Sequence, residues 1–154
     1  MTNVIQKLES LGLNIEKPNA EVGHLPADIT VLSSEQLGEK FTILTAWADY
    51  AAAQLAVAQI EERAVQRKLD LLENTLLVTK LGSATKTERV TLVKAQIATD
   101  PEVVRLSQEN EEKYAYRKLV EVMLGNYERD IALISRELTR RSNDLRSTRK
   151  EWTL

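Results

Sequence analysis

A heptad repeat in the first half of the chain limits the folds open to it. Apolar residues recur at alternating steps of four and three, and one polar residue interrupts them. The twelve positions are Leu37, Phe41, Leu44, Ala48, Ala51, Leu55, Ala58, Glu62, Val65, Leu69, Leu72 and Leu76. A repeat of more than five heptads indicates one continuous helix with a single packing seam. At about 1.5 Å per residue this helix would be roughly 70 Å long, too long for the core helix of a compact globule.

Local signals mark both ends of this helix. Ser33 with Gln36 three residues later forms a capping box, so we expect the helix to begin there. Gly82 is a suitable residue for the position just after a helix end, where we expect it to stop.

A short middle helix is expected next. Residues Thr85 to Glu88 form a second capping box, and an apolar face follows at Val90, Val93 and Ile97. We then expect Asp100 to be the N-cap of the next helix and Pro101 to be the first residue of that helix.

The second long helix is expected from Pro101 to about Thr148. Its C-terminal part keeps the seam at Val120, Leu124, Tyr127, Ile131, Ile134, Leu138, Arg141, Leu145, Thr148 and Trp152. Earlier in the helix the same register meets Asn110, Lys113 and Arg117. We therefore expect the packing face to shift at that point.

These elements predict an all-α fold: a long antiparallel helical hairpin with a short middle helix, coiled-coil-like and homo-oligomeric. A lone hairpin should not enclose large side chains such as Phe41, Trp47, Met123 and Tyr127, so we expect copies of the chain to associate. Residues 33–154 would form this oligomerisation domain. Residues 1–32, with Pro18, Gly23 and Pro26, would form an N-terminal arm and connector, either docked or disordered.

The composition agrees with long helices in one 154-residue domain. Glycine (5) and proline (3) are scarce, and 43% hydrophobic residues are too many for a disordered chain. Without cysteine there are no disulfides and no thiolate metal sites. We find no signal-peptide pattern and no stretch long and apolar enough to span a membrane. These observations predict a soluble cytoplasmic protein.

Few residues could support catalysis. His24 is the only histidine and lies in the Pro/Gly connector. The five glycines are isolated, so no glycine-rich phosphate loop exists. The carboxylates of "IEER" and "NEEK" fit solvated helix faces better than an acid/base or metal site. We expect no enzymatic activity, no metal site and no cofactor.

Basic residues are the more informative group. The window from Arg136 to Lys150 has a net charge of +4, and because the whole chain carries −2 the remainder carries −6. This window indicates either an anionic partner or cations that complement a helix C-terminus. The middle of the chain holds a second set, which an oligomer would repeat around its axis and present to phosphates. Its members are Arg63, Arg67, Lys68, Lys80, Lys86, Arg89 and Lys94.

Aromatic residues accompany these cations. Trp47 and Tyr50 share a helix face, and Tyr114, Tyr116 and Tyr127 mark the second helix. Aromatic rings near cations can stack on bases, although at helical spacing they belong more often to a core.

The chain resembles the UvsY-type family of phage recombination mediators. That family has a long first helix with a tryptophan, then a basic Lys-Ala-Arg-Leu-Asp element. Here Trp47 lies in the first helix, and "QRKLD" (Gln66–Asp70) supplies Lys68, Leu69 and Asp70, with Gln66 in place of the first lysine. A Pro/Asp-rich break, the segment "DPEVVRLSQENEEKYAYRKLVEVML" that comes next and the arginine-containing last helix are also similar to the second half of the family's pattern. The resemblance covers residues 33–146.

The resemblance implies a homo-oligomer that binds single-stranded DNA. Such proteins help to load a RecA-like recombinase onto strands covered by single-strand-binding protein, in the host cytoplasm if the gene is phage-encoded. Arg67 and Lys68 are the first expected phosphate contacts, and the C-terminal cations are the last. The alternative is a structural or scaffolding coiled-coil protein, such as a virion component, without DNA-binding activity.

Overall fold

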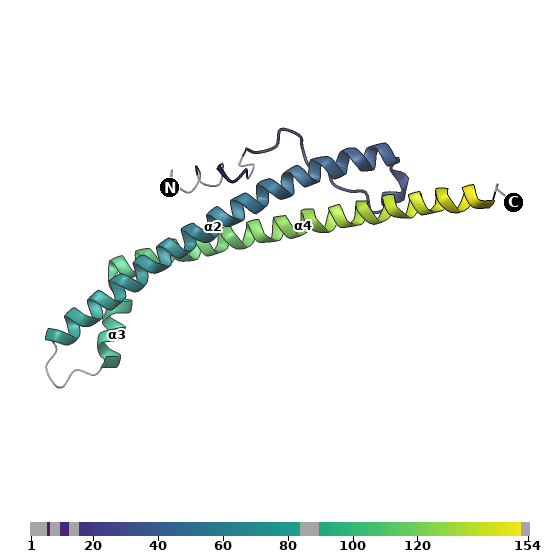
Figure 1. Ribbon diagram of the computed structural model, residues 1–154. Coiled ribbons are helices and arrows are strands. Elements are labelled where there is room, and N and C mark those ends of the chain that lie inside the picture. Colours follow the sequence, from purple (N-terminus) through teal and green to yellow (C-terminus); the bar gives the residue numbers. More distant parts are fainter. Residues whose placement is uncertain (1–5, 7–9, 13–15, 84–89, 152–154) are drawn as a thin grey trace. The chain divides into compact units, whose positions relative to one another are not determined.

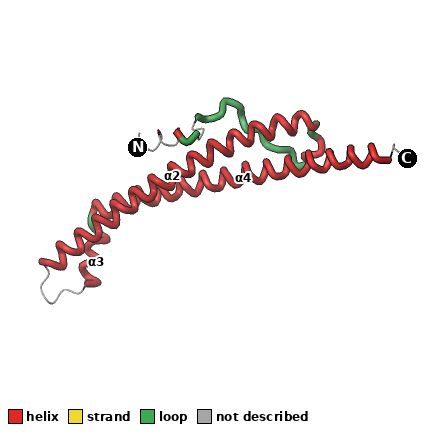
Figure 2. The backbone as a smooth tube through the Cα atoms, viewed as in Figure 1, coloured by secondary structure: helices red, strands yellow, loops and turns green. Residues whose placement is uncertain are grey.

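The computed structural model describes residues 6, 10–12, 16–83 and 90–151, and the side chains of all of these except residues 83 and 147–151. Its elements are the 3-10 helix η1 (Ile29–Val31) and the α-helices α2 (Ser34–Ser83), α3 (Val90–Ala98) and α4 (Pro101–Glu151) (Figure 1). The described chain contains no strand (Figure 2). The predicted all-α hairpin with a short middle helix is confirmed: α2 and α4 pack against each other.

The predicted helix starts are confirmed by their hydrogen bonds. Ser33 N donates to Gln36 Oε1 at 2.8 Å and Gln36 N donates to Ser33 Oγ at 3.1 Å, which completes the capping box. At α4, Glu102 N donates to Asp100 Oδ1 at 3.0 Å. The expected end of α2 is slightly wrong, because Gly82 lies inside the last turn and without a positive φ. The capping box predicted at Thr85–Glu88 lies outside the described residues.

The chain divides into two compact units. One comprises residues 1–54 and 120–154, and the other comprises residues 55–119. In the first unit, Leu37, Leu44 and Ile134 are buried together. Half-buried side chains of the arm and of both helices pack around them, namely Val22, Leu25, Leu32, Phe41, Tyr127, Ile131 and Leu138. Val22, Leu25 and Leu32 therefore pack the second half of the arm on the helices of its unit.

In the second unit the core joins three helices. Its buried residues are Val65, Leu69, Val93, Ile97, Val103 and Leu106, with Leu72, Leu76 and Leu77 packed against them. The short helix α3 thus covers the end of the α2 seam. Val93 and Ile97, which belong to the expected apolar face of α3, are buried in this contact.

The predicted shift of the packing face is wrong. Asn110 Nδ2 donates to Gln66 Oε1 at 2.8 Å, and Lys113 Nζ donates to Glu61 Oε2 at 2.8 Å. Arg117 Nε donates to Glu62 Oε2, with both side chains about one-fifth exposed. We call these three pairs the polar layer. Partners on α2 accept hydrogen bonds from all three α4 side chains, although the buried Asn110 Oδ1 accepts none within the described residues. The seam therefore keeps its register through these residues.

The α2 seam itself is covered by the chain's own elements. Every one of its twelve positions is buried or half-buried, including Glu62. Phe41, Trp47 and Tyr127 are also half-buried, whereas Met123 is 44% exposed. A second chain is therefore not needed to bury the seam.

Candidate nucleic-acid interface

Three cations on the outside of α2 form what we call the basic cluster: Arg63, Arg67 and Lys68. All three are exposed, and none is in an ion pair within the described part of the chain. They follow the seam residues Glu62 and Val65, so the packing of the seam turns them outward. Arg63 and Arg67 are one helical turn apart on the same face. The cluster can therefore offer two guanidinium groups and one ammonium group to an anion.

Other cations of this unit are already paired. Lys113 and Arg117 belong to the polar layer, and the Arg117 guanidinium also lies 5.0 Å from the centroid of the Tyr114 ring. Arg105 is paired with Glu102 at 2.7 Å and with Glu109 at 3.2 Å. The hydrogen bond and charge of Glu102 raise the pKa of Arg105, so this cation is held by its own helix.

The remaining predicted contacts lie elsewhere. Lys80, in the last turn of α2, is half-buried and has an interaction of its own. Lys94 is exposed and lines a cleft of about 380 Å³ whose other lining residues are Glu73, Asn74, Leu77, Ile97 and Ala98. A carboxylate in the same cleft makes it a poorer phosphate site than the basic cluster. Lys86 and Arg89 lie outside the described residues.

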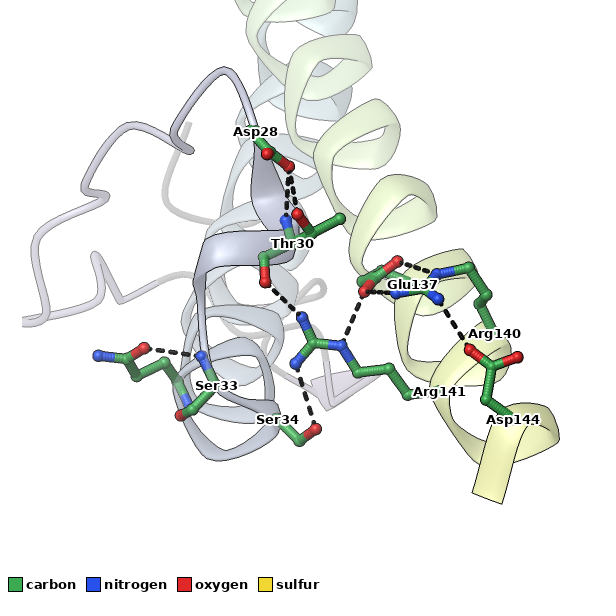
Figure 3. Close-up of polar contacts among 9 residues, drawn as sticks. Asp28, Thr30, Ser33, Ser34, Glu137, Arg140, Arg141 and Asp144 are labelled. Carbon is green, nitrogen blue, oxygen red and sulfur yellow. Dashed lines mark hydrogen bonds and ion pairs between the residues drawn. The ribbon is translucent and has the colours of Figure 1, made fainter. Parts of the chain in front are cut away.

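The C-terminal arginines have structural partners that the sequence did not reveal. Glu137 is only 7% exposed and lies between Arg140 and Arg141, each with a nitrogen 2.7 Å from Glu137 Oε1. Arg141 also donates to Thr30 O at 3.1 Å and to Ser34 Oγ at 3.3 Å (Figure 3). This side chain therefore ties α4 to η1 and to the start of α2. Arg140, which is itself exposed, and Arg141 are held by carboxylates, whereas the exposed Arg136 and Arg146 have no ion pair within the described part of the chain.

The same contacts change the acidity of Glu137. Hydrogen bonds from Arg140 and Arg141, aided by their charges, lower the pKa of Glu137 from 4.5 to about 2. Hydrogen bonds from Thr30 likewise lower the pKa of Asp28, whose Oδ1 accepts from the Thr30 N–H at 2.9 Å. Two ionised carboxylates thus support the junction between arm and helices (Figure 3).

This arrangement predicts an acid-sensitive junction. The ionised Glu137 stabilises the folded protein fully above pH 4.5, its unfolded pKa, and this contribution disappears as the pH falls toward about 2. Glu137→Gln should therefore lower the melting temperature at pH 7, and the difference from the unmodified protein should shrink between pH 4.5 and pH 2. Thermal melts across this range test it, with exposed Glu111→Gln as the control. A difference independent of pH would contradict the assignment.

The aromatic residues separate into two groups. The Trp47 and Tyr50 rings meet edge to face with their centroids 5.8 Å apart, and the centroids of the Trp47 and Tyr127 rings are 6.2 Å apart. Its Nε1 donates to Ala20 O at 2.8 Å, and Lys17 Nζ lies 5.7 Å from the ring centroid, so the arm holds it. Tyr116 is instead 48% exposed. Trp47 therefore serves the packing of its unit, as is usual for aromatic residues at helical spacing.

His24 is exposed in the connector. Among the described residues no group of three or more His, Cys, Asp and Glu side chains is placed to hold a metal ion. No helix in the described part of the chain is long and apolar enough to cross a membrane.

Comparisons with known proteins identify no relative. No protein-family model, no curated protein and no solved structure matches the chain. The resemblance to recombination mediators therefore stays a prediction based on the sequence.

Proposed function

We propose that this protein is a non-enzymatic accessory factor that binds the phosphate backbone of single-stranded DNA through the basic cluster. One observation carries the proposal: these three cations are exposed and without ion pairs in the described structure, while neighbouring cations of the same unit are neutralised by carboxylates. Unpaired cations one turn apart on a rigid helix can replace the counterions of a nucleic-acid strand. Binding would be independent of sequence, because phosphate contacts do not read bases.

The proposed biological role is assistance to a recombinase in homologous recombination. It rests on the resemblance of Trp47 and the segment Gln66–Asp70 to the mediator family. A RecA-like recombinase and a single-strand-binding protein would then be further partners. The scaffold alternative is favoured by a different observation, the large apolar side chains that α2 exposes, which we consider below.

A matched pair of variants tests the proposed interface. The double change Arg63→Ala with Lys68→Ala removes two of the three cations of the basic cluster. It should weaken binding to a labelled oligo-dT on the order of tenfold or more at ~0.1 M salt. The slope of log affinity against log salt should fall by about 1.4, since each lost contact to a single strand releases about 0.7 counterion. Fluorescence anisotropy measures both quantities.

The control removes two exposed cations from the C-terminal window, Arg136→Ala with Arg146→Ala, and changes the net charge by the same amount. It should leave affinity nearly unchanged. If the control lost more affinity than the basic-cluster variant, the anion site would lie in the C-terminal window. If neither variant changed binding, the basic cluster would not be the interface.

A further inference from the structure

A second heptad stripe runs along α2 on the face away from the seam. Its positions alternate by three and four: Val57, Ile60, Ala64, Arg67, Leu71, Asn74, Val78 and Leu81. We call it the outer stripe. Val57 is half-buried, but four other large apolar side chains are exposed: Ile60 by 45%, Leu71 by 70%, Val78 by 73% and Leu81 by 39%. Single exposed apolar residues are ordinary, but a heptad repeat of them marks a helix face built to meet another helix.

We infer that the outer stripe binds the outer stripe of a second copy of this chain, in antiparallel orientation about a twofold axis. This inference does not depend on DNA binding. The spacing permits it, because one antiparallel register matches every stripe position with another one, and the charges described below distinguish this orientation from a parallel one.

In that register the apolar ends of the outer stripe meet each other. Val57 lies opposite Leu81 of the second copy and Ile60 lies opposite its Val78, so each end buries a pair of branched aliphatic side chains. In the middle, the small Ala64 faces Asn74, and Arg67 faces Leu71. A twofold contact of this kind uses the same surface on both chains.

The charges favour the same orientation. Arg67, in the middle of the outer stripe, is exposed and without an ion pair in the described structure, and Asp70, next to the stripe residue Leu71, is exposed as well. Asp70 Oδ1 accepts from Gln66 Nε2 at 2.8 Å, which leaves the carboxylate with further acceptor positions. In the antiparallel pair, Arg67 opposite Leu71 of the second copy is adjacent to that copy's Asp70, and symmetry repeats the pair. In a parallel pair, Arg67 would instead meet Arg67 of the second copy.

The interface and the proposed DNA contacts can coexist. The aliphatic part of Arg67 would pack against Leu71 of the second copy while its guanidinium reaches the interface edge. Arg63 and Lys68 lie on the two sides of the outer stripe, so they stay open to phosphate. In the dimer, Arg67 therefore mainly contacts the second copy.

Sedimentation equilibrium of the full chain tests the association. The unmodified protein should be dimeric at ~100 μM. The double change Leu71→Glu with Val78→Glu should raise the dissociation constant of the dimer at least tenfold, because each dimer would bury four carboxylates. Circular dichroism should show unchanged helicity, since both positions are exposed. Leu145→Glu, at an equally exposed position outside the stripe (73%), should leave the dimer intact. A monomeric unmodified protein, or a dimer unaffected by the double change, would overturn the inference.

Two further pairs of variants keep the inference testable even if that double variant unfolded. Arg67→Asp should weaken association, and adding Asp70→Arg should restore it. Orientation is read from cysteines, because the natural chain has none. Ile60→Cys with Val78→Cys should form crosslinked dimers on oxidation, whereas Ile60→Cys alone should not. Crosslinking of the single variant would refute the antiparallel register, and failure of the charge exchange to restore association would refute the Arg67–Asp70 pair.

Discussion

Replacing Ile134 with alanine is expected to destabilise the protein by about 2–5 kcal/mol, the range for a truncated aliphatic side chain in a packed core. Ile134 is fully buried and clusters with Leu37 and Leu44. Its truncation would leave a cavity at a point where side chains of both long helices and of the arm pack together. Urea unfolding followed by circular dichroism measures the effect.

Leu145→Ala is the matched control for this prediction. Leu145 lies on the same helix but is 73% exposed, so its truncation should change stability by no more than about 0.5 kcal/mol. Equal unfolding midpoints for Ile134→Ala and the unmodified protein would contradict the described core.

The second large effect concerns the polar layer. Arg117→Ala should cost about 1–3 kcal/mol, because it leaves the Glu62 carboxylate in the seam without its cation. The cost stays below that of a fully buried pair because both side chains are about one-fifth exposed. Changing both residues, Glu62→Leu with Arg117→Leu, should restore most of the stability, since apolar residues then fill the seam.

Arg105→Ala provides the comparison, because it breaks ion pairs on the surface of α4. Its partner Glu102 is 54% exposed, so we expect little change in the unfolding midpoint. If the double leucine variant were as unstable as Arg117→Ala, the unpaired Glu62 carboxylate would not explain the cost of Arg117→Ala.

The polar layer also has a role in specifying the hairpin. Sliding α4 along α2 by one heptad would keep apolar positions opposite one another. The same slide would separate Lys113 from Glu61, Arg117 from Glu62 and Asn110 from Gln66. These pairs therefore select one register among several that hydrophobic contacts alone would allow.

Helix type and helix starts could be predicted from local sequence because their causes are local. Ser33 with Gln36, and Asp100 with Pro101, act within one turn of the helix that they start. The polar layer could not be predicted in this way. Lys113 and Glu61 are 52 residues apart, and a heptad pattern read on each helix separately does not say which polar groups will face one another.

The candidate site shows the same division. The exposure of Arg63, Arg67 and Lys68 follows directly from their places outside the seam. The structural role of Arg141 does not, since its contact with Thr30 spans 111 residues. The sequence therefore presents the arginine-rich end as one basic window, whereas the structure separates the internally paired Arg140 and Arg141 from exposed Arg136 and Arg146.

Titration of the unmodified protein with fluorescently labelled oligo-dT at ~50 mM and ~200 mM salt tests the proposed function most directly. With two phosphate contacts per subunit, from Arg63 and Lys68, affinity should fall about sevenfold or more between the two conditions. An oligonucleotide of mixed sequence should bind with similar affinity. No binding at ~50 mM salt, or an affinity that does not change with salt, would contradict the proposal and favour a structural role for the hairpin.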